Sequence, residues 1–190
     1  MRIVGGKYKG KKLSQPIDKI TRPLKDLVKE SIFNIIQHSK KINVKVESSK
    51  ILDLYAGSGS FGLECISRNA DLVCFFEKHL NALKILSKNI NLLGKNLNFK
   101  IYNKDCFKFL ATDSFIEKSF DIIFLDPPFK EITVNEILDL IDKKNILKDN
   151  GIIIVHRHIK DKIIFLSKYK IIEERKYGIS KIFFLKKFNF

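Results

Sequence analysis

The chain has 190 residues, of which 45% are hydrophobic, and its mean hydropathy is −0.07. This composition predicts one soluble domain with room for a two-sided core, and it excludes a disordered chain. No run of about 18 apolar residues predicts a membrane span, and the N-terminus lacks the apolar stretch of a signal peptide. The three cysteines form no C-x-x-C pair. We therefore expect free thiols and a cytoplasmic protein.

The net charge of +15 is unevenly distributed along the chain. Residues 1–50 contain 13 Lys/Arg against 4 Asp/Glu, a net of +9, whereas residues 51–130 contain 10 against 9, a net of +1. A basic flank beside a nearly neutral segment indicates a polyanionic partner next to a small-molecule site. The alternative is that an AT-rich genome enriches the chain in lysine without a functional reason. This explanation applies best to the excess of positive charge in the C-terminal residues.

Residues 2–13 alternate weakly around Gly5-Gly6 and Gly10, which predicts a short basic hairpin. We expect residues 1–20 to form this extension and residues 21–190 to form the main domain. Its cations would bind nucleic acid, and its tyrosine would stack on a base. The alternative is a solvated edge hairpin whose charges prevent association between strands. The candidate RNA-binding residues are Arg2, Lys7, Tyr8, Lys9, Lys11 and Lys12, with Arg22 just beyond them.

The segment Thr21-Arg22-Pro23 predicts the start of a helix, with threonine as the N-cap and proline in the first turn. Apolar residues then recur at helical spacing to about Ile36, and Lys25 and Lys29 lie off that face, where we expect them to be solvated. The predicted apolar face consists of Leu24, Leu27, Val28, Ile32, Ile35 and Ile36.

From residue 50 onward, apolar strands alternate with helical stretches, of which His79–Leu93 is the clearest. This alternation predicts an α/β fold with a mostly parallel sheet and right-handed crossovers. The tail has strand character around a turn near Gly178, so the sheet should end in antiparallel strands. The predicted strands are Ile51–Leu54, Leu72–Phe76, Leu97–Tyr102, Ile122–Leu125, Ile152–Val155, Ile163–Leu166, Tyr169–Glu174 and Ile179–Lys187.

Parallel α/β sheets bind ligands at the carboxyl ends of their strands. The first predicted strand ends in Asp53 and a Gly57-x-Gly59 turn, which lets the backbone approach a nucleotide-like ligand. Glu77 follows the second strand, about twenty residues after Gly57, where an acid would bond ribose hydroxyls. Asp105 follows the third strand, either as an acceptor for an adenine amine or as a helix N-cap. The glycines alone do not identify the ligand.

The fourth strand ends in Asp126-Pro127-Pro128-Phe129. Prolines have no N–H, so this turn is rigid and its carbonyls remain available as acceptors. An exocyclic amine of a nucleobase needs such acceptors, because they align its N–H groups toward an electrophile. Phe129 would stack on the base.

The chain resembles S-adenosylmethionine-dependent amino-methyltransferases and, more narrowly, the RsmD family, whose members methylate N2 of one guanine in bacterial 16S ribosomal RNA. The resemblance extends from residue 1 to about residue 157. It rests on residues 2–10, Thr21-Arg22-Pro23, residues 29–34, 52–59, 62–64, Ser67-Arg68 and residues 126–129.

The resemblance implies a Rossmann-like class I methyltransferase with a seven-stranded sheet and 16S ribosomal RNA, free or within a small-subunit particle, as partner. It implies that Asp126 to Phe129 receive the flipped guanine and that the basic hairpin binds RNA. One departure is His156, because related sequences often have Glu there. The implied binding residues for S-adenosylmethionine are Asp53, Ala56, Gly57, Ser58, Gly59, Glu77, Lys78, Asp105, Cys106 and Asp126.

Direct attack by the guanine amine needs no covalent enzyme adduct, so we interpret the Cys106 thiol as structural rather than nucleophilic. His156 and His158 form no complete metal site with other ligands, and we expect no metal.

Three alternatives remain open. An adenine-N6 methyltransferase of DNA or RNA also uses an acid-Pro-Pro-aromatic turn, but a DNA enzyme would need a recognition domain. A nicotinamide-dependent oxidoreductase would leave residues 126–129 unexplained. A non-catalytic RNA-binding protein would be expected to lose Asp53 or Asp126, and both are present.

Overall fold

The structure is a computed structural model that describes residues 1–15, 24–112, 119–128 and 133–188. The elements in chain order are α1 (Asp26–His38), β1 (Lys50–Leu54), α2 (Ser60–Ser67), β2 (Leu72–Phe76), α3 (Leu80–Leu93), β3 (Phe99–Tyr102), α4 (Cys106–Ala111), β4 (Phe120–Leu125), α5 (Val134–Lys143), β5 (Leu147–His158), β6 (Tyr169–Tyr177) and β7 (Ser180–Lys187).

Within the described ranges the strands form a seven-stranded sheet in the order β3-β2-β1-β4-β5-β7-β6. The first five strands pair in parallel, and β7 pairs antiparallel with both β5 and β6. This confirms the predicted parallel sheet with antiparallel strands at its end. The order reverses between β1 and β4, and this switch point is where doubly wound sheets bind ligands.

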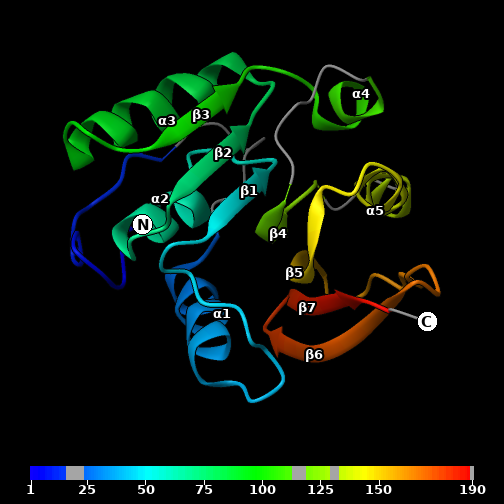
Figure 1. The fold of residues 1–190 in the computed structure, drawn as a ribbon. Coiled ribbons are helices and arrows are strands. Elements are labelled where there is room, and N and C mark those ends of the chain that lie inside the picture. The colour runs from blue at the N-terminus through cyan, green and yellow to red at the C-terminus, as the bar shows by residue number, and fades with distance from the viewer. Residues whose placement is uncertain (16–23, 113–118, 129–132, 189–190) are drawn as a thin grey trace.

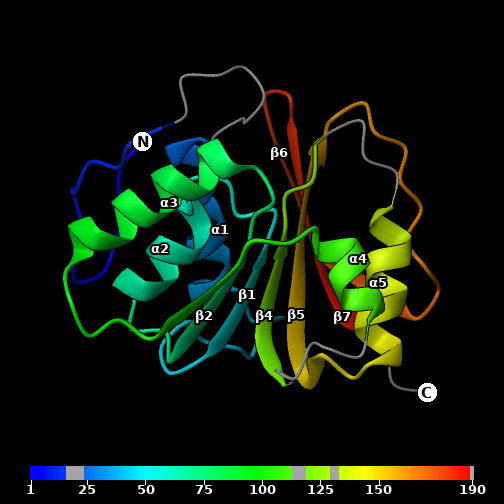
Figure 2. The ribbon, with the colours of Figure 1, turned by 90° about the horizontal axis from the view of Figure 1, so that it is seen from above.

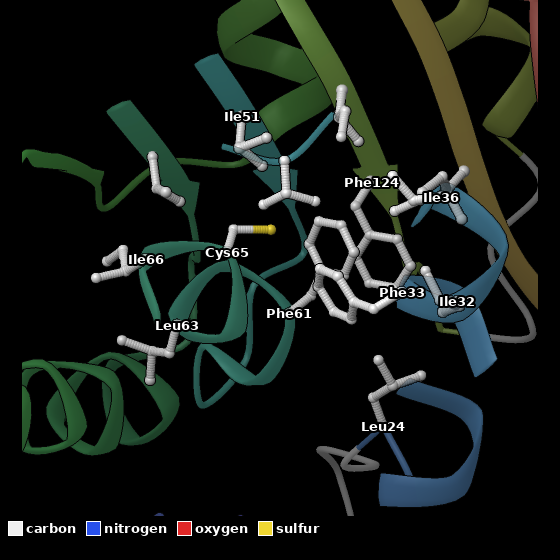
Figure 3. Packing of buried hydrophobic residues seen from close by; sticks show 14 of the residues in the cluster. Leu24, Ile32, Phe33, Ile36, Ile51, Phe61, Leu63, Cys65, Ile66 and Phe124 are labelled. Atoms are coloured by element: carbon white, nitrogen blue, oxygen red, sulfur yellow. The ribbon is translucent and has the colours of Figure 1, made fainter. Parts of the chain in front are cut away.

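Helices cover both faces of the sheet, with α1, α2 and α3 on one side and α4 and α5 on the other (Figures 1 and 2). On the first side Phe61 of α2 lies between Phe33 of α1 and Phe124 of β4, at centroid distances of 5.2 and 4.1 Å (Figure 3). These stacked rings fasten the first two helices to the centre of the sheet, because aromatic side chains bury a large apolar area.

The N-terminal hairpin is confirmed by an antiparallel bridge between Arg2 and Lys12. It runs along α2 toward the C-terminal end of that helix, where the N–H of Lys7 donates to the Ser67 carbonyl (2.7 Å). Gly6 has a φ of +74°, and a Cβ there would lie 1.9 Å from the Ser67 oxygen. Only glycine allows this approach, which explains why the Gly5-Gly6 and Ser67-Arg68 motifs occur together.

The helix predicted to start at residues 21–23 begins instead at Asp26, with Lys25 as N-cap; residues 21–23 lie outside the described ranges. The predicted apolar face is wrong at Leu27, which is 68% exposed. The prediction of a solvated Lys29 is also wrong, since it is fully buried. The buried face is shifted by a fraction of a turn and consists of Val28, Lys29, Ile32, Phe33 and Ile36.

The prediction of a strand at residues 163–166 is wrong as well, because this segment has no regular secondary structure. It lies beside the start of α5, where the Ile164 carbonyl accepts from the Asn135 side chain (2.9 Å). Its apolar side chains Ile163, Phe165 and Leu166 pack against the core on the α4–α5 side. Their alternation therefore reflects packing rather than strand pairing. The boundary predicted between the hairpin and the main domain, at residues 20 and 21, falls outside the described ranges.

Candidate active site

Asp53 is the penultimate residue of β1 and Asp126 directly follows β4, and these parallel strands are neighbours, since Leu54 of β1 pairs with Leu125 of β4. Asp53 is 1% exposed, and its Oδ2 accepts the backbone N–H of Gly62 in α2 (3.0 Å). Burial raises the pKa of Asp53 well above its ordinary value; the Gly62 hydrogen bond opposes that shift, and the charges of Asp126 and Glu77 add to it. The first acid therefore holds the start of α2 and faces a second acid on the next strand.

The loop after β1 carries the predicted glycines. Gly59 is the N-cap of α2 with a φ of +83°, and a Cβ there would lie 2.4 Å from the Leu86 side chain. At Gly57, by contrast, a Cβ would meet no atom within 4 Å. The loop is thus packed against α3 at one glycine and open at the other, which leaves its backbone accessible to a ligand.

Glu77 is only 6% exposed, so it is not a surface charge. Its Oε2 accepts the backbone N–H of Gly57 (2.8 Å), and its Oε1 accepts that of His79 (2.7 Å). The carboxylate therefore holds the open part of the loop against the end of β2. Each oxygen has a second lone pair, so a ribose hydroxyl could still bind there.

The other predicted loop residues, Ala56 and Ser58, are also nearly buried. The Ala56 N–H donates to the Phe76 carbonyl (2.8 Å). The Ser58 carbonyl accepts from the amide of Asn89 in α3 (3.0 Å), and its hydroxyl lies 3.9 Å from the Met1 sulfur. Asn89 was missed because it looks like an ordinary polar residue of a helix.

Asp105 caps α4, since its Oδ1 accepts the Lys108 N–H (3.1 Å), while its Oδ2 pairs with Lys78 (2.9 Å). Partial burial raises the pKa of Asp105, but the bonds from Lys78 and the Lys108 N–H outweigh it and lower that pKa overall. The predicted N-cap role is therefore confirmed. The next residue, Cys106, is buried, and this burial raises the pKa of its thiol to about 12, as expected for a structural cysteine.

The acceptor turn, residues 126–128, begins directly after β4; the fourth predicted residue, Phe129, lies outside the described ranges. The Asp126 Oδ1 is 2.8 Å from Nδ1 of His156 on the neighbouring strand β5. A guanidinium N–H of Arg157 points to the Pro128 carbonyl (3.4 Å). Two consecutive residues of β5 thus hold the turn, and the sequence pattern assigned a role to neither.

Lys29 of α1 links the N-terminal hairpin to α2. Its Nζ donates to the Arg2 carbonyl (2.6 Å) and the Ser60 hydroxyl (3.3 Å), and it lies 3.5 Å from Asp26 and 3.9 Å from Glu64. Desolvation lowers the pKa of this buried lysine, although the two carboxylates act to raise it.

Glu64 is equally buried and accepts the Val4 N–H (2.8 Å) and the Arg68 side chain (2.9 Å). Both Lys29 and Glu64 lie in motifs on which the family resemblance rests, which is the signal that could have revealed them.

The predicted RNA-binding cations of the hairpin are exposed, and Tyr8 is half-buried between Lys7 and Lys11, whose Nζ atoms lie 5.5 and 5.3 Å from its ring centroid. A base that stacks on Tyr8 would therefore lie beside these lysines. Because the hairpin follows α2, its tip lies at the C-terminal end of an eight-residue helix, about 12 Å from the cofactor loop. Arg22 lies outside the described ranges.

Within the described residues, no group of three or more His, Cys, Asp or Glu could hold a metal ion. His156 is bonded to Asp126, and the Nδ1 of His158 accepts the Lys160 N–H (3.1 Å). None of the helices described is long and apolar enough to cross a bilayer.

The family model described as Conserved hypothetical protein 95 matches residues 1–186. The chain belongs to this family, the RsmD family. Among relatives, the chain is 31% identical over 180 residues to "Ribosomal RNA small subunit methyltransferase D" of Haemophilus influenzae, covering 94% of this chain and 90% of that protein.

Solved structures give the same fold. The structure of yhhF from Escherichia coli, described as a methyltransferase, matches with a TM-score of 0.83 and 26% identity over 98% of this chain and 97% of that one. SMU.776 complexed with SAH matches with a TM-score of 0.64 and 14% identity over 82% of this chain and 49% of that one. The sheet and its helices therefore have the fold of S-adenosylmethionine-dependent methyltransferases.

Proposed function

We propose that this RsmD-family protein methylates the exocyclic N2 amine of a specific guanine in small-subunit ribosomal RNA, with S-adenosylmethionine as the methyl donor. The observation that carries the proposal is the pairing of two strand ends. The cofactor loop after β1 and the acceptor turn after β4 lie side by side at the switch point of the sheet. A methyl donor and an amine would meet there.

The loop residues fit the proposed cofactor. Gly57 leaves its backbone open to a ligand, and Glu77 beside it offers lone pairs to ribose hydroxyls. Asp105 lies just beyond the end of the third strand, paired with Lys78, and it would accept from the adenine amine. When bound, S-adenosylmethionine supplies a sulfonium methyl group, and the C–S electron pair stays on sulfur as the new N–C bond forms.

The acceptor turn would act on the amine. The Asp126 carboxylate accepts one amine N–H, which localises the nitrogen lone pair, and then takes the proton that the nitrogen loses. The base reaches this turn by flipping out of its helix, since a stacked amine could not approach the strand ends. Phe129 would stack against the flipped base.

The exposed cations of the hairpin would bind RNA phosphates along the α2 side of the molecule. Because its tip lies about 12 Å from the cofactor loop, it would grip RNA that flanks the target nucleotide rather than the target itself. We place this reaction in the cytoplasm, on ribosomal RNA or on a small-subunit particle.

The proposal is tested by mass spectrometry of nucleosides from the small-subunit ribosomal RNA of cells with and without this gene. We expect N2-methylguanosine to decrease by one residue per RNA, and the purified protein with labelled S-adenosylmethionine to restore it. A loss of N6-methyladenosine instead would favour the adenine-N6 alternative. Binding of NADH but not of S-adenosylmethionine would rule out a methyltransferase.

A further inference from the structure

We infer that His156 is a positioning residue for Asp126, which fixes the orientation of the acceptor carboxylate for methyl transfer. The inference rests on the proposed function. The role of His156 follows from its surroundings in the sheet.

The register of the sheet brings the two side chains together. Leu125 of β4 pairs with Val155 of β5, so Asp126 and His156 are the next residues on adjacent parallel strands. Ile154 and Phe124, one step before on the same face, belong to the core on the α1–α3 side. Both polar side chains continue that face at the carboxyl edge of the sheet, where the cofactor loop lies.

The contact has the geometry of a strong hydrogen bond. Nδ1 of His156 lies 2.8 Å from Oδ1 of Asp126, and the side chains are 5% and 19% exposed. With the proton on Nδ1, the imidazole donates to the carboxylate, and hydrogen bonds to a charged acceptor are among the strongest in proteins. The bond engages Oδ1 and leaves Oδ2 to accept from the substrate amine.

Other charged groups near the pair have different partners. Asp53 on β1 faces Asp126 from the same side of the sheet and bonds Gly62. Glu77, after β2, bonds the backbone of the cofactor loop. Arg157 reaches the turn from the opposite face of β5, and it binds the Pro128 carbonyl and Asp161. The imidazole of His156 is therefore the described side chain that orients the Asp126 carboxylate itself.

Three substitutions separate orientation from packing. His156→Asn keeps a donor near the position of Nδ1, His156→Gln moves the donor to the position of Nε2, and His156→Leu removes it. We expect the Leu and Gln variants to lose about 10- to 100-fold in kcat, because misplacement of a catalytic group by about 1 Å has such effects. The Asn variant should recover most of this loss, and the KM for S-adenosylmethionine should change by less than about threefold throughout.

His158→Leu, two residues along the same strand, is the matched control and should leave kcat unchanged. Wild-type kcat in the His156→Leu variant would overturn the inference. Equal losses of kcat in the Asn and Leu variants would also overturn it, because they would mean that His156 contributes only by packing. If His156→Leu does not fold, the comparison of the Asn and Gln variants decides.

A measurement without activity tests the contact itself. In the free protein, ¹⁵N NMR should show the His156 ring protonated at Nδ1, and Asp126→Ala should shift the tautomer toward Nε2, since the hydrogen bond sets the tautomer. An unchanged ring spectrum would overturn the inference. If the wild-type protein methylates no RNA while the tautomer shifts as expected, the proposed function fails and the pairing stands.

Discussion

The cofactor loop after β1 and the acceptor turn after β4 lie at neighbouring strand ends, but opposite kinds of groups hold them in place. Buried carboxylates accept backbone N–H groups of the loop and of the segments beside it: Asp53 accepts that of Gly62 in α2, and Glu77 accepts those of Gly57 in the loop and of His79 after β2. The loop therefore needs acceptors, and the acids at the ends of β1 and β2 provide them.

The acceptor turn has the reverse chemistry. Its prolines have no N–H, and the Asp126 N–H already donates to the Leu54 carbonyl (3.4 Å), so the turn mainly offers oxygens. Its supports are donors from β5: His156 for the Asp126 carboxylate and Arg157 for the Pro128 carbonyl. The comparison shows that the backbone chemistry of each segment determines the side chains that hold it. In this protein the glycine-rich loop is held by buried acids, and the proline-containing turn is held by His156 and Arg157.

The largest effect should come from removing the acid of the acceptor turn. Asp126→Ala should lower kcat by about 1000-fold or more, since it removes the group that accepts the amine proton. The affinity for S-adenosylmethionine, measured by calorimetry, should stay within a few-fold of wild type. Asp149→Ala, an exposed acid, is the control. Activity that survives Asp126→Ala would remove the acceptor turn from the mechanism.

The second effect concerns stability on the cofactor side. Lys29→Met leaves Glu64 buried without its lysine and Arg2 without a donor for its carbonyl. Breaking such a buried charge network should reduce the free energy of unfolding by about 3 kcal/mol, measured with urea. Lys25→Met, at an exposed lysine of the same helix, should change it by less than about 0.5 kcal/mol. Equal effects of the two variants would mean that the hairpin is held by its apolar contacts alone.

The acid of the cofactor loop should appear in the pH dependence of stability. Burial raises the pKa of Asp53 in the folded state, so above its ordinary value of about 3.9 the folded protein holds a proton that the unfolded chain releases. Stability of the wild type should therefore fall as pH rises from about 4 to the folded-state pKa. The side chain of the Asp53→Asn variant can still accept the Gly62 N–H, but it has no titratable group, so the variant does not lose stability in this way as pH rises.

The stability difference between Asp53→Asn and wild type, measured with urea at several pH values, should thus shift in favour of the variant as pH rises. It should be constant below about pH 4, where both forms are neutral. A difference independent of pH would mean that folding does not raise the pKa of Asp53.

The smallest effect concerns the hairpin, which lies outside the loop and the turn. Reversing the charges of Lys9, Lys11 and Lys12 should weaken RNA binding and make it less dependent on salt. The slope of log K against log salt should fall by about 0.7–0.9 for each phosphate that the protein no longer neutralises. Reversal of Lys162, Lys170 and Lys176, exposed lysines of the C-terminal region, removes the same net charge and is the control. Equal changes in RNA binding for both variants would mean that the hairpin lysines have no specific role and only reflect a lysine-rich composition.

Much of the fold could be predicted from local patterns. Leu72–Phe76 is a strand as predicted, because a five-residue apolar run buried on both faces has few other conformations. The Gly57–Gly59 turn and the Asp126-Pro127-Pro128 segment were also recognisable, since glycine and proline restrict the backbone by themselves. Helix α1 shows the limit: its periodicity predicted a helix, but the buried face includes Lys29 and excludes Leu27.

The sequence by itself determined most of the elements, their order and the acids at the strand ends, because these depend on hydrophobic periodicity and on the backbone limits of Gly and Pro. The predicted strand at residues 163–166 is the exception. Only the tertiary structure decided which partners meet. Lys29 is buried because Arg2, Ser60 and Glu64 satisfy it from separate segments, together with Asp26 of its own helix. His156 meets Asp126 because β4 and β5 pair in one register. Such contacts join residues about thirty positions apart, and no local pattern contains the register or the packing that brings them together.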